Sequence, residues 1–93
     1  MKTLRLIWSD EALGDVREII DYIAQRNVPA ALRLEQAMHD CAERLSHHPM
    51  MYRSGRAPNT REAVVHPNYL IIYRIDEDEV VIANVVHARQ QYP

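Results

Sequence analysis

The sequence predicts an α+β fold with the element order β-α-α-β-β-β, in which a helical hairpin packs on a mostly antiparallel four-stranded sheet. Two observations lead to this fold class. Apolar residues recur at helical spacing between residues 10 and 47, and three β-rich runs separated by turn residues follow from residue 60. The 93 residues, of which 47% are hydrophobic and 26% charged, have an ordinary globular composition. We therefore expect a single domain over residues 1–93.

The N-terminal half is predicted to be a short strand followed by two helices. Residues 3–8 alternate apolar and polar side chains loosely, as in a strand, and Ser9 is a suitable N-cap for a first helix. The second helix is expected from Pro29 to about residue 47. Because a proline disfavours helical backbone in the residue before it, the break falls at residues 27–29, and the short connection makes the helices antiparallel neighbours.

The C-terminal half is predicted to be a loop followed by three strands. Residues 49–59 contain Gly55 and Pro58 and are expected to form the loop. Strands are expected at residues 60–65, 69–75 and 80–86, joined by turns at residues 66–68 and 76–79. The last run is apolar on both faces apart from Asn84, so it is expected to be a central strand covered on both sides.

Composition and spacing exclude several classes of function. The single cysteine, Cys41, lies on the apolar stripe of the second helix, so we expect a buried thiol and no disulfide. The five histidines lack metal-ligand spacing and the two glycines form no phosphate-binding loop, so neither a metal nor a cofactor is expected. No apolar run approaches the roughly 20 residues that span a bilayer, and no leader is recognisable, so a cytoplasmic protein without membrane contact is expected.

Charged residues are distributed unevenly although the net charge is only −2. Residues 49–75 carry four arginines and one glutamate, whereas residues 76–79 are all acidic. Arginine suits the recognition of phosphate or carboxylate groups, so the middle segment is a candidate binding surface. The alternative is that these arginines are ordinary solvated surface residues.

A candidate site for phosphodiester chemistry is predicted at one end of the sheet. Arg61 and Arg74 fall near the same end of the predicted hairpin, and His87 and Tyr92 follow the last strand. If these groups converge, the arginines would stabilise negative charge while histidine and tyrosine transfer protons. Each also has a structural interpretation: His87 would cap a strand end, Tyr92 would cover the sheet edge, and Arg61 would pair with a charge across the strands.

Three blocks of the sequence carry a resemblance that extends over nearly the whole chain. They are T-R-E at residues 60–62, Y-L-I-I-Y-R at residues 69–74 and H-A-R-Q-Q-Y-P at residues 87–93, with shorter matches such as Trp8-Ser9 and Gly55-Arg56. In this order, and with the β-α-α-β-β-β arrangement, they resemble the RelE/ParE superfamily of bacterial toxins. The helical hairpin, Gly55-Arg56 and the ending are closer to the ParE-like branch.

The resemblance implies the toxin of a type II toxin–antitoxin module, of the kind that stabilises plasmids. It implies a cognate antitoxin that neutralises the toxin, with operator DNA contacted only indirectly through that antitoxin. ParE-like members act on DNA gyrase, whereas RelE-like members are ribosome-dependent mRNA endoribonucleases. A net charge of −2 with one lysine suits ribosomal RNA poorly, so a growth inhibitor acting on gyrase is favoured and the endoribonuclease is the alternative.

The candidate residues divide between these two functions. An endoribonuclease would use His87, Tyr92, Arg61 and Arg74 as its catalytic residues. A gyrase inhibitor would use Arg53, Arg56, Arg61, Arg74 and Arg89 as a surface for its target and its antitoxin. A decayed toxin that keeps only antitoxin binding is a third interpretation.

Overall fold

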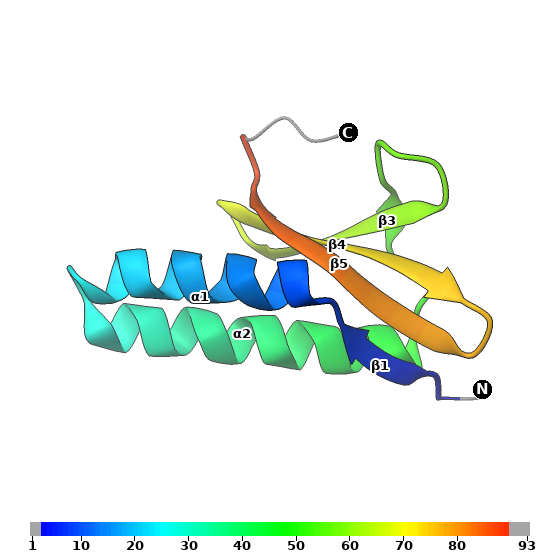
Figure 1. Ribbon diagram of the computed structural model, residues 1–93, viewed down its shortest axis with the longest axis horizontal. Helices are drawn as coiled ribbons and strands as arrows, with labels where there is room; N and C mark the ends of the chain where they lie inside the picture. The colour runs from blue at the N-terminus through cyan, green and yellow to red at the C-terminus, as the bar shows by residue number, and fades with distance from the viewer. Residues whose placement is uncertain (1–2, 90–93) are drawn as a thin grey trace.

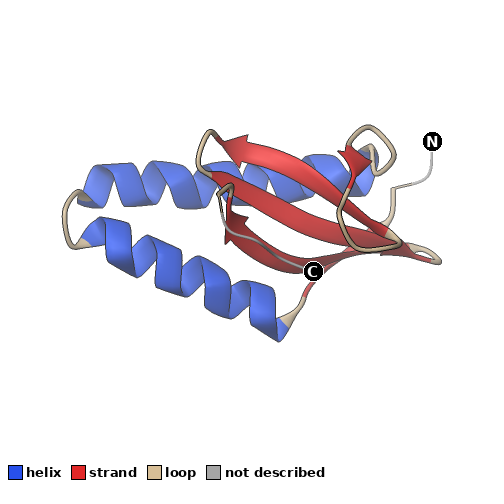
Figure 2. Cartoon of the chain, turned by 90° about the horizontal axis from the view of Figure 1, so that it is seen from above, coloured by secondary structure: helices blue, strands red, loops and turns tan. Residues whose placement is uncertain are grey.

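The computed structural model describes residues 3–89, in which two helices cover one face of a five-stranded sheet (Figures 1 and 2). In chain order the elements are β1 (Arg5–Trp8), α1 (Asp10–Ala24), α2 (Val28–His47), β2 (Arg53–Ser54), β3 (Thr60–His66), β4 (Tyr69–Asp76) and β5 (Glu79–His87). The α+β class, the helical hairpin and the order of the predicted elements are confirmed.

The strands lie in the order β1-β5-β4-β3-β2, and every neighbouring pair is antiparallel except β1 and β5. The expectation of four strands with a plain loop at residues 49–59 was wrong in one respect. Arg53 and Ser54 pair with Glu62 and Arg61 and so add a fifth, two-residue strand. A strand of two residues is too short to show an alternation of side chains, so no pattern in the sequence predicted it.

Both helices begin at the predicted polar caps. The Ser9 hydroxyl accepts a hydrogen bond from the backbone N–H of Ala12, and the Asn27 side chain accepts one from Ala30. Pro29 lies in the first turn of α2, where its missing N–H has no helical partner to lose. Neither helix in the described part of the chain has the length and apolar character needed to cross a membrane.

The hydrophobic core lies between the helices and the facing side of the sheet. Its largest fully buried side chains include Met38 and Leu45 from α2, Ile71 and Tyr73 from β4, and Ile82 from β5. Cys41 is buried in the same core, and burial raises the pKa of its thiol, as expected for a structural cysteine. A smaller cluster on the opposite face of the sheet contains Leu70, Ile72 and Val86.

β5 is an inner strand between β1 and β4, as its apolar sequence predicted. Its two neighbours cover different lengths of it. β4 pairs with β5 from Glu79 to His87, whereas β1 pairs only from Glu79 to Ile82. Ser9 then donates its N–H to the Ile82 carbonyl, and the chain turns into α1. The second half of β5 therefore has α1 beside it in place of a strand (Figure 1).

Candidate functional site

The arginines predicted to form a basic surface lie mainly at the end of the sheet where β3 begins and β4 ends. Arg53 pairs in register with Glu62, and its Nε lies 2.6 Å from the Glu62 carboxylate. Only 10% of the Glu62 side chain is exposed, so this carboxylate is well placed to hold the guanidinium against the sheet. Arg53 thus has an acidic partner within the chain.

Arg61 is on the helix-facing side of the sheet, in register with Tyr73. Its Nη1 donates a hydrogen bond of 2.7 Å to the backbone carbonyl of Tyr52, in the segment between α2 and β2. The Tyr73 hydroxyl donates a bond of 2.7 Å to the carbonyl of Pro49 in the same segment. Two side chains from the sheet therefore hold this segment by its carbonyl groups.

Tyr73 is unsuited to proton transfer near neutral pH. Burial raises the pKa of Tyr73 to about 12, an effect that the nearby Arg61 only partly opposes. The ring also packs edge-on against that of Tyr52, with the ring centres 6.3 Å apart. We conclude that Arg61 and Tyr73 have structural roles in the loop segment.

A cleft of about 730 Å³ lies beside this segment, with Arg56 and Arg61 in its lining. One wall of the cleft is formed where the backbone of Gly55 approaches the side chain of Thr60. The N–H of Gly55 donates to the carbonyl of Thr60, and a Cβ at residue 55 would overlap the Thr60 hydroxyl. Glycine is required here because the two segments touch. Asp76 also lines the cleft and reduces its positive charge.

Arg74 lies at the same end of the sheet as Arg61 but on the opposite face. Side chains alternate along a strand, and Arg74 follows Tyr73, which points toward the helices. Its Nε lies 2.8 Å from an oxygen of Asp76, the first residue of the predicted acidic run. The last two residues of that run, Asp78 and Glu79, are ion-paired with Arg5. The acidic turn thus neutralises arginines of its own chain.

His87 lies at the other end of the sheet, and the predicted convergence with Arg61 and Arg74 was wrong. His87 is in register with Tyr69, with their ring centres 5.3 Å apart. Arg74 lies five positions after Tyr69 in β4, or about 17 Å along the extended chain. The reason is topological: β5 runs antiparallel to β4, so it ends where β4 begins.

The remaining candidates follow β5. The N–H of Arg89 donates to Nδ1 of His87, which places Arg89 at the His87 end and away from Arg53, Arg56, Arg61 and Arg74. Tyr92 lies outside the described residues. Among residues 3–89, no group of three or more histidine, cysteine, aspartate or glutamate side chains is arranged to hold a metal ion.

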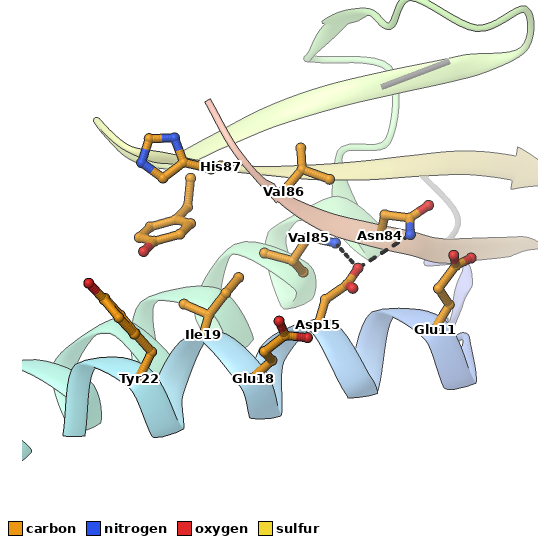
Figure 3. A pocket seen from close by; sticks show the side chains of 10 residues that line it. Glu11, Asp15, Glu18, Ile19, Tyr22, Asn84, Val85, Val86 and His87 are labelled. Carbon is orange, nitrogen blue, oxygen red and sulfur yellow. Dashed lines mark hydrogen bonds between the residues drawn. The ribbon is translucent and has the colours of Figure 1, made fainter. Parts of the chain in front are cut away.

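A second groove, of about 450 Å³, was not anticipated as a site. It runs between α1 and the second half of β5 and is lined by Glu11, Asp15, Glu18, Ile19, Tyr22, Tyr69, Asn84, Val85, Val86 and His87 (Figure 3). One oxygen of Asp15 accepts hydrogen bonds from the backbone N–H of Val85, at 2.9 Å, and from the side chain of Asn84, at 3.3 Å. The signal in the sequence was Asn84, the one polar residue between Val80 and Val86 in β5.

Known proteins resemble this chain over nearly all of its length. The family model described as "ParE toxin of type II toxin-antitoxin system, parDE" matches residues 6–92. The protein Y4kP of Sinorhizobium fredii is 37% identical over 94 residues, which cover 100% of this chain and 97% of Y4kP. Toxin RelE2 of Caulobacter vibrioides is 34% identical over 84 residues, which cover 90% of this chain and 94% of RelE2.

Two solved structures share the fold. One, the chromosomal ParDE toxin–antitoxin system from P. aeruginosa, aligns with a TM-score of 0.80 at 18% identity and covers 91% of this chain and 96% of that one. The other, the toxin–antitoxin complex RelBE2 from Mycobacterium tuberculosis, aligns with a TM-score of 0.71 at 24% identity and covers 97% of each chain.

Proposed function

The chain belongs to the ParE toxin family of type II toxin–antitoxin systems, and we propose that it inhibits growth by acting on DNA gyrase in the cytoplasm until a cognate antitoxin neutralises it. A role in plasmid stabilisation follows from the same proposal. Contact with operator DNA would be indirect, through the antitoxin.

The separation of the nuclease candidates is the observation that carries the choice of target. Acid–base catalysis needs the proton-transferring group within hydrogen-bond reach of the reacting atoms, about 3 Å. His87 lies at one end of the sheet, and Arg61 and Arg74 lie at the other end on opposite faces. A single phosphodiester cannot contact all three groups in this arrangement. This supports an inhibitor that works by binding.

The pairing of the arginines supports the same choice. Arg53 and Arg74 are engaged by Glu62 and Asp76, and Arg61 is engaged by a backbone carbonyl. Binding to ribosomal RNA depends on cations that neutralise phosphate groups and release counterions. Arginines that already have acidic partners contribute less to such binding than solvated ones.

An antitoxin partner is supported by the exposed apolar surface of the helical hairpin, which extends past the sheet (Figure 1). Leu13, Tyr22, Val28 and Leu32 have about half of their surface exposed. Exposed apolar surface of this kind is typical of regions that a partner covers. The ParDE and RelBE2 structures that share this fold belong to toxin–antitoxin systems.

The alternative is a RelE-like, ribosome-dependent mRNA endoribonuclease, and one observation favours it. The relative at 34% identity is named Toxin RelE2. Under this alternative, His87, Tyr92, Arg61 and Arg74 would be the catalytic residues. Of these, His87 lies at the end of β5, where its Nδ1 accepts a hydrogen bond from the N–H of Arg89.

A supercoiling assay tests the proposal. Purified toxin is incubated with gyrase, ATP and relaxed plasmid, and we expect loss of supercoiling or accumulation of cleaved plasmid. Arg56→Ala in the loop cleft should weaken the inhibition, whereas Arg17→Ala on the exposed side of α1 serves as the matched control. Unimpaired gyrase at toxin excess would contradict the proposed target.

The endoribonuclease is tested separately by mapping mRNA cleavage on translating ribosomes. Codon-linked cuts that disappear in His87→Ala would establish the alternative. Absence of cuts, combined with growth arrest after induction without antitoxin, would exclude both the endoribonuclease and a decayed toxin.

A further inference from the structure

The second half of β5 is an open sheet edge. β1 pairs with β5 only as far as Trp8 opposite Ile82, and within residues 3–89 no strand pairs with that side of β5 beyond this point. Open strand edges present backbone N–H and C=O groups that can pair with another chain, and proteins usually protect them. This edge is therefore a position where a further strand would fit.

A β-bulge sets the direction of the backbone groups along this edge. The register shifts between Ile72 opposite Asn84 and Tyr73 opposite Ile82, so that Ala83 is an extra residue on β5. The Ser9 hydroxyl donates to the Ala83 carbonyl and fixes the point where β1 leaves the edge. Beyond the bulge, the N–H of Val85 points toward α1, because it donates to the Asp15 carboxylate.

Asp15 thus occupies the place of the missing strand. Its carboxylate supplies one acceptor to the edge and also binds the Asn84 side chain (Figure 3). A side chain of this kind protects an edge without covering it. An incoming carbonyl group could replace the carboxylate at Val85 and leave Asp15 available to a cation.

The groove beside this edge has an acidic wall. Glu11, Asp15 and Glu18 project from α1 toward β5 (Figure 3). None of the three takes part in the ion pairs found among residues 3–89. His87 is the one basic side chain in the lining, and Arg26 lies just outside it, over the ring of Tyr22. Ile19 and Tyr22 supply apolar surface between the charges and the hairpin tip.

We propose that an extended, cationic segment of the antitoxin binds here as an additional strand, in line with β1. Backbone hydrogen bonds to the edge at Val85 and His87 would supply affinity. Lysine or arginine side chains on the helix-facing side of the segment would contact Glu11, Asp15 and Glu18, and apolar ones would pack on Ile19 and Tyr22. The inference rests on the proposed function for the identity of the partner, whereas the charge and the extended backbone come from the groove.

The first test uses synthetic peptides and the full chain, followed by NMR of labelled backbone amides. The probes are an eight-residue peptide of alternating arginine and valine and its glutamate–valine counterpart. We expect the arginine peptide to bind at least about tenfold more tightly, with shifts at Val85, His87 and α1 residues 15–22. Methylation of alternate backbone nitrogens in the peptide should abolish binding, because the strand pairing is lost.

Variants of α1 distinguish binding in this groove from a general electrostatic attraction between the cationic peptide and acidic side chains. Glu18→Gln should weaken binding of the arginine peptide several-fold, whereas Asp21→Asn, on the same helix but outside the groove, should not. Equal affinity for both peptides, insensitivity to backbone methylation, or shifts confined to other surfaces would each overturn the proposed site.

The antitoxin itself tests the identity of the partner. We expect binding of the antitoxin to shift the amide signals of Val85 and His87 in the labelled toxin. These shifts should be smaller in Glu18→Gln. A tight antitoxin complex with no change at these amides would overturn the inference. If gyrase proves insensitive to the toxin while these shifts are present, the proposed target fails and the docking site is supported.

Discussion

The two ends of the sheet treat their charged side chains in opposite ways. At the loop end, Arg53 and Arg74 have acidic partners from this chain, and Arg61 is bonded to a backbone carbonyl. At the other end, the carboxylates of α1 that face β5 have no arginine or lysine partner among residues 3–89. The first arrangement stabilises a loop, and the second leaves charge available for a partner.

The difference shows what a count of charges along the sequence leaves out, namely which charges keep a partner within the folded chain. The loop end is the more basic part of the sequence, yet most of its cations are already engaged within the fold. The α1 groove belongs to a helix of mixed charge that gave no functional signal by itself. What matters is the number of charges left without a partner after folding, since a paired exposed charge adds little to a new contact.

Replacing Tyr73 should cause the largest loss of stability among the variants that test this difference between the two ends. Its side chain is fully buried and holds the loop segment through the Pro49 carbonyl. Tyr73→Ala should lower the free energy of unfolding by about 3 to 5 kcal/mol, and Tyr73→Phe by about 1 to 3 kcal/mol, measured by urea denaturation. A loss below about 1 kcal/mol in Tyr73→Ala would show that the loop end is not held in this way.

Tyr73 should also make the free energy of unfolding depend on pH, with an effect smaller than the loss expected in Tyr73→Ala. Because the pKa of Tyr73 is raised from 10.0 to about 12 in the folded state, the folded protein keeps a proton that the unfolded chain loses. Its stabilising contribution is present below pH 10 and is lost as the pH rises toward 12. Unfolding measured across this window should be less pH-dependent in Tyr73→Phe than in the unmodified protein; equal slopes would contradict the raised pKa.

Asp15 provides the corresponding test at the open edge. Asp15→Ala leaves the N–H of Val85 and the side chain of Asn84 without this acceptor, and should cost about 1 to 2 kcal/mol in urea denaturation. Asp15→Asn keeps an acceptor and should cost less. Amide exchange at Val85 should be faster in Asp15→Ala but not in Asp15→Asn, which would show that the loss of stability arises at this edge. If both variants match the original protein, Asp15 does not protect the edge.

The smallest effect is expected at the exposed pair of Arg74 and Asp76, each of which is nearly half exposed. Arg74→Ala should change the free energy of unfolding by less than about 0.5 kcal/mol at low salt. It should have no measurable effect at about 1 M salt, where the Debye length is only about 3 Å. A salt-independent loss would mean that Arg74 does more than pair with Asp76.

Most of the fold was predictable because local signals agreed. The cap residue Ser9, the break at residues 27–29 and the β-rich runs each identified an element whose bounds the structure reproduces within about two residues. The two-residue strand β2 was missed because it forms only through register with Glu62 and Arg61.

The candidate site was less predictable, because it depends on which strand ends meet. Arg61, Arg74 and His87 are individually reasonable candidates, but antiparallel pairing of β4 and β5 sends His87 to the far end of the sheet. Asp15 was not among the candidate residues, because its carboxylate binds Val85, which lies 70 residues later in the chain.

By itself, the sequence determined the helices, the three long strands, the burial of Cys41 and the family, because periodicity, capping and short motifs are local properties. Only the tertiary structure decided which arginines are engaged and where the open edge of β5 lies. Those features depend on pairings between residues far apart in the chain. Their energies arise only when the sheet has assembled, since partner, register and burial are all set at that stage.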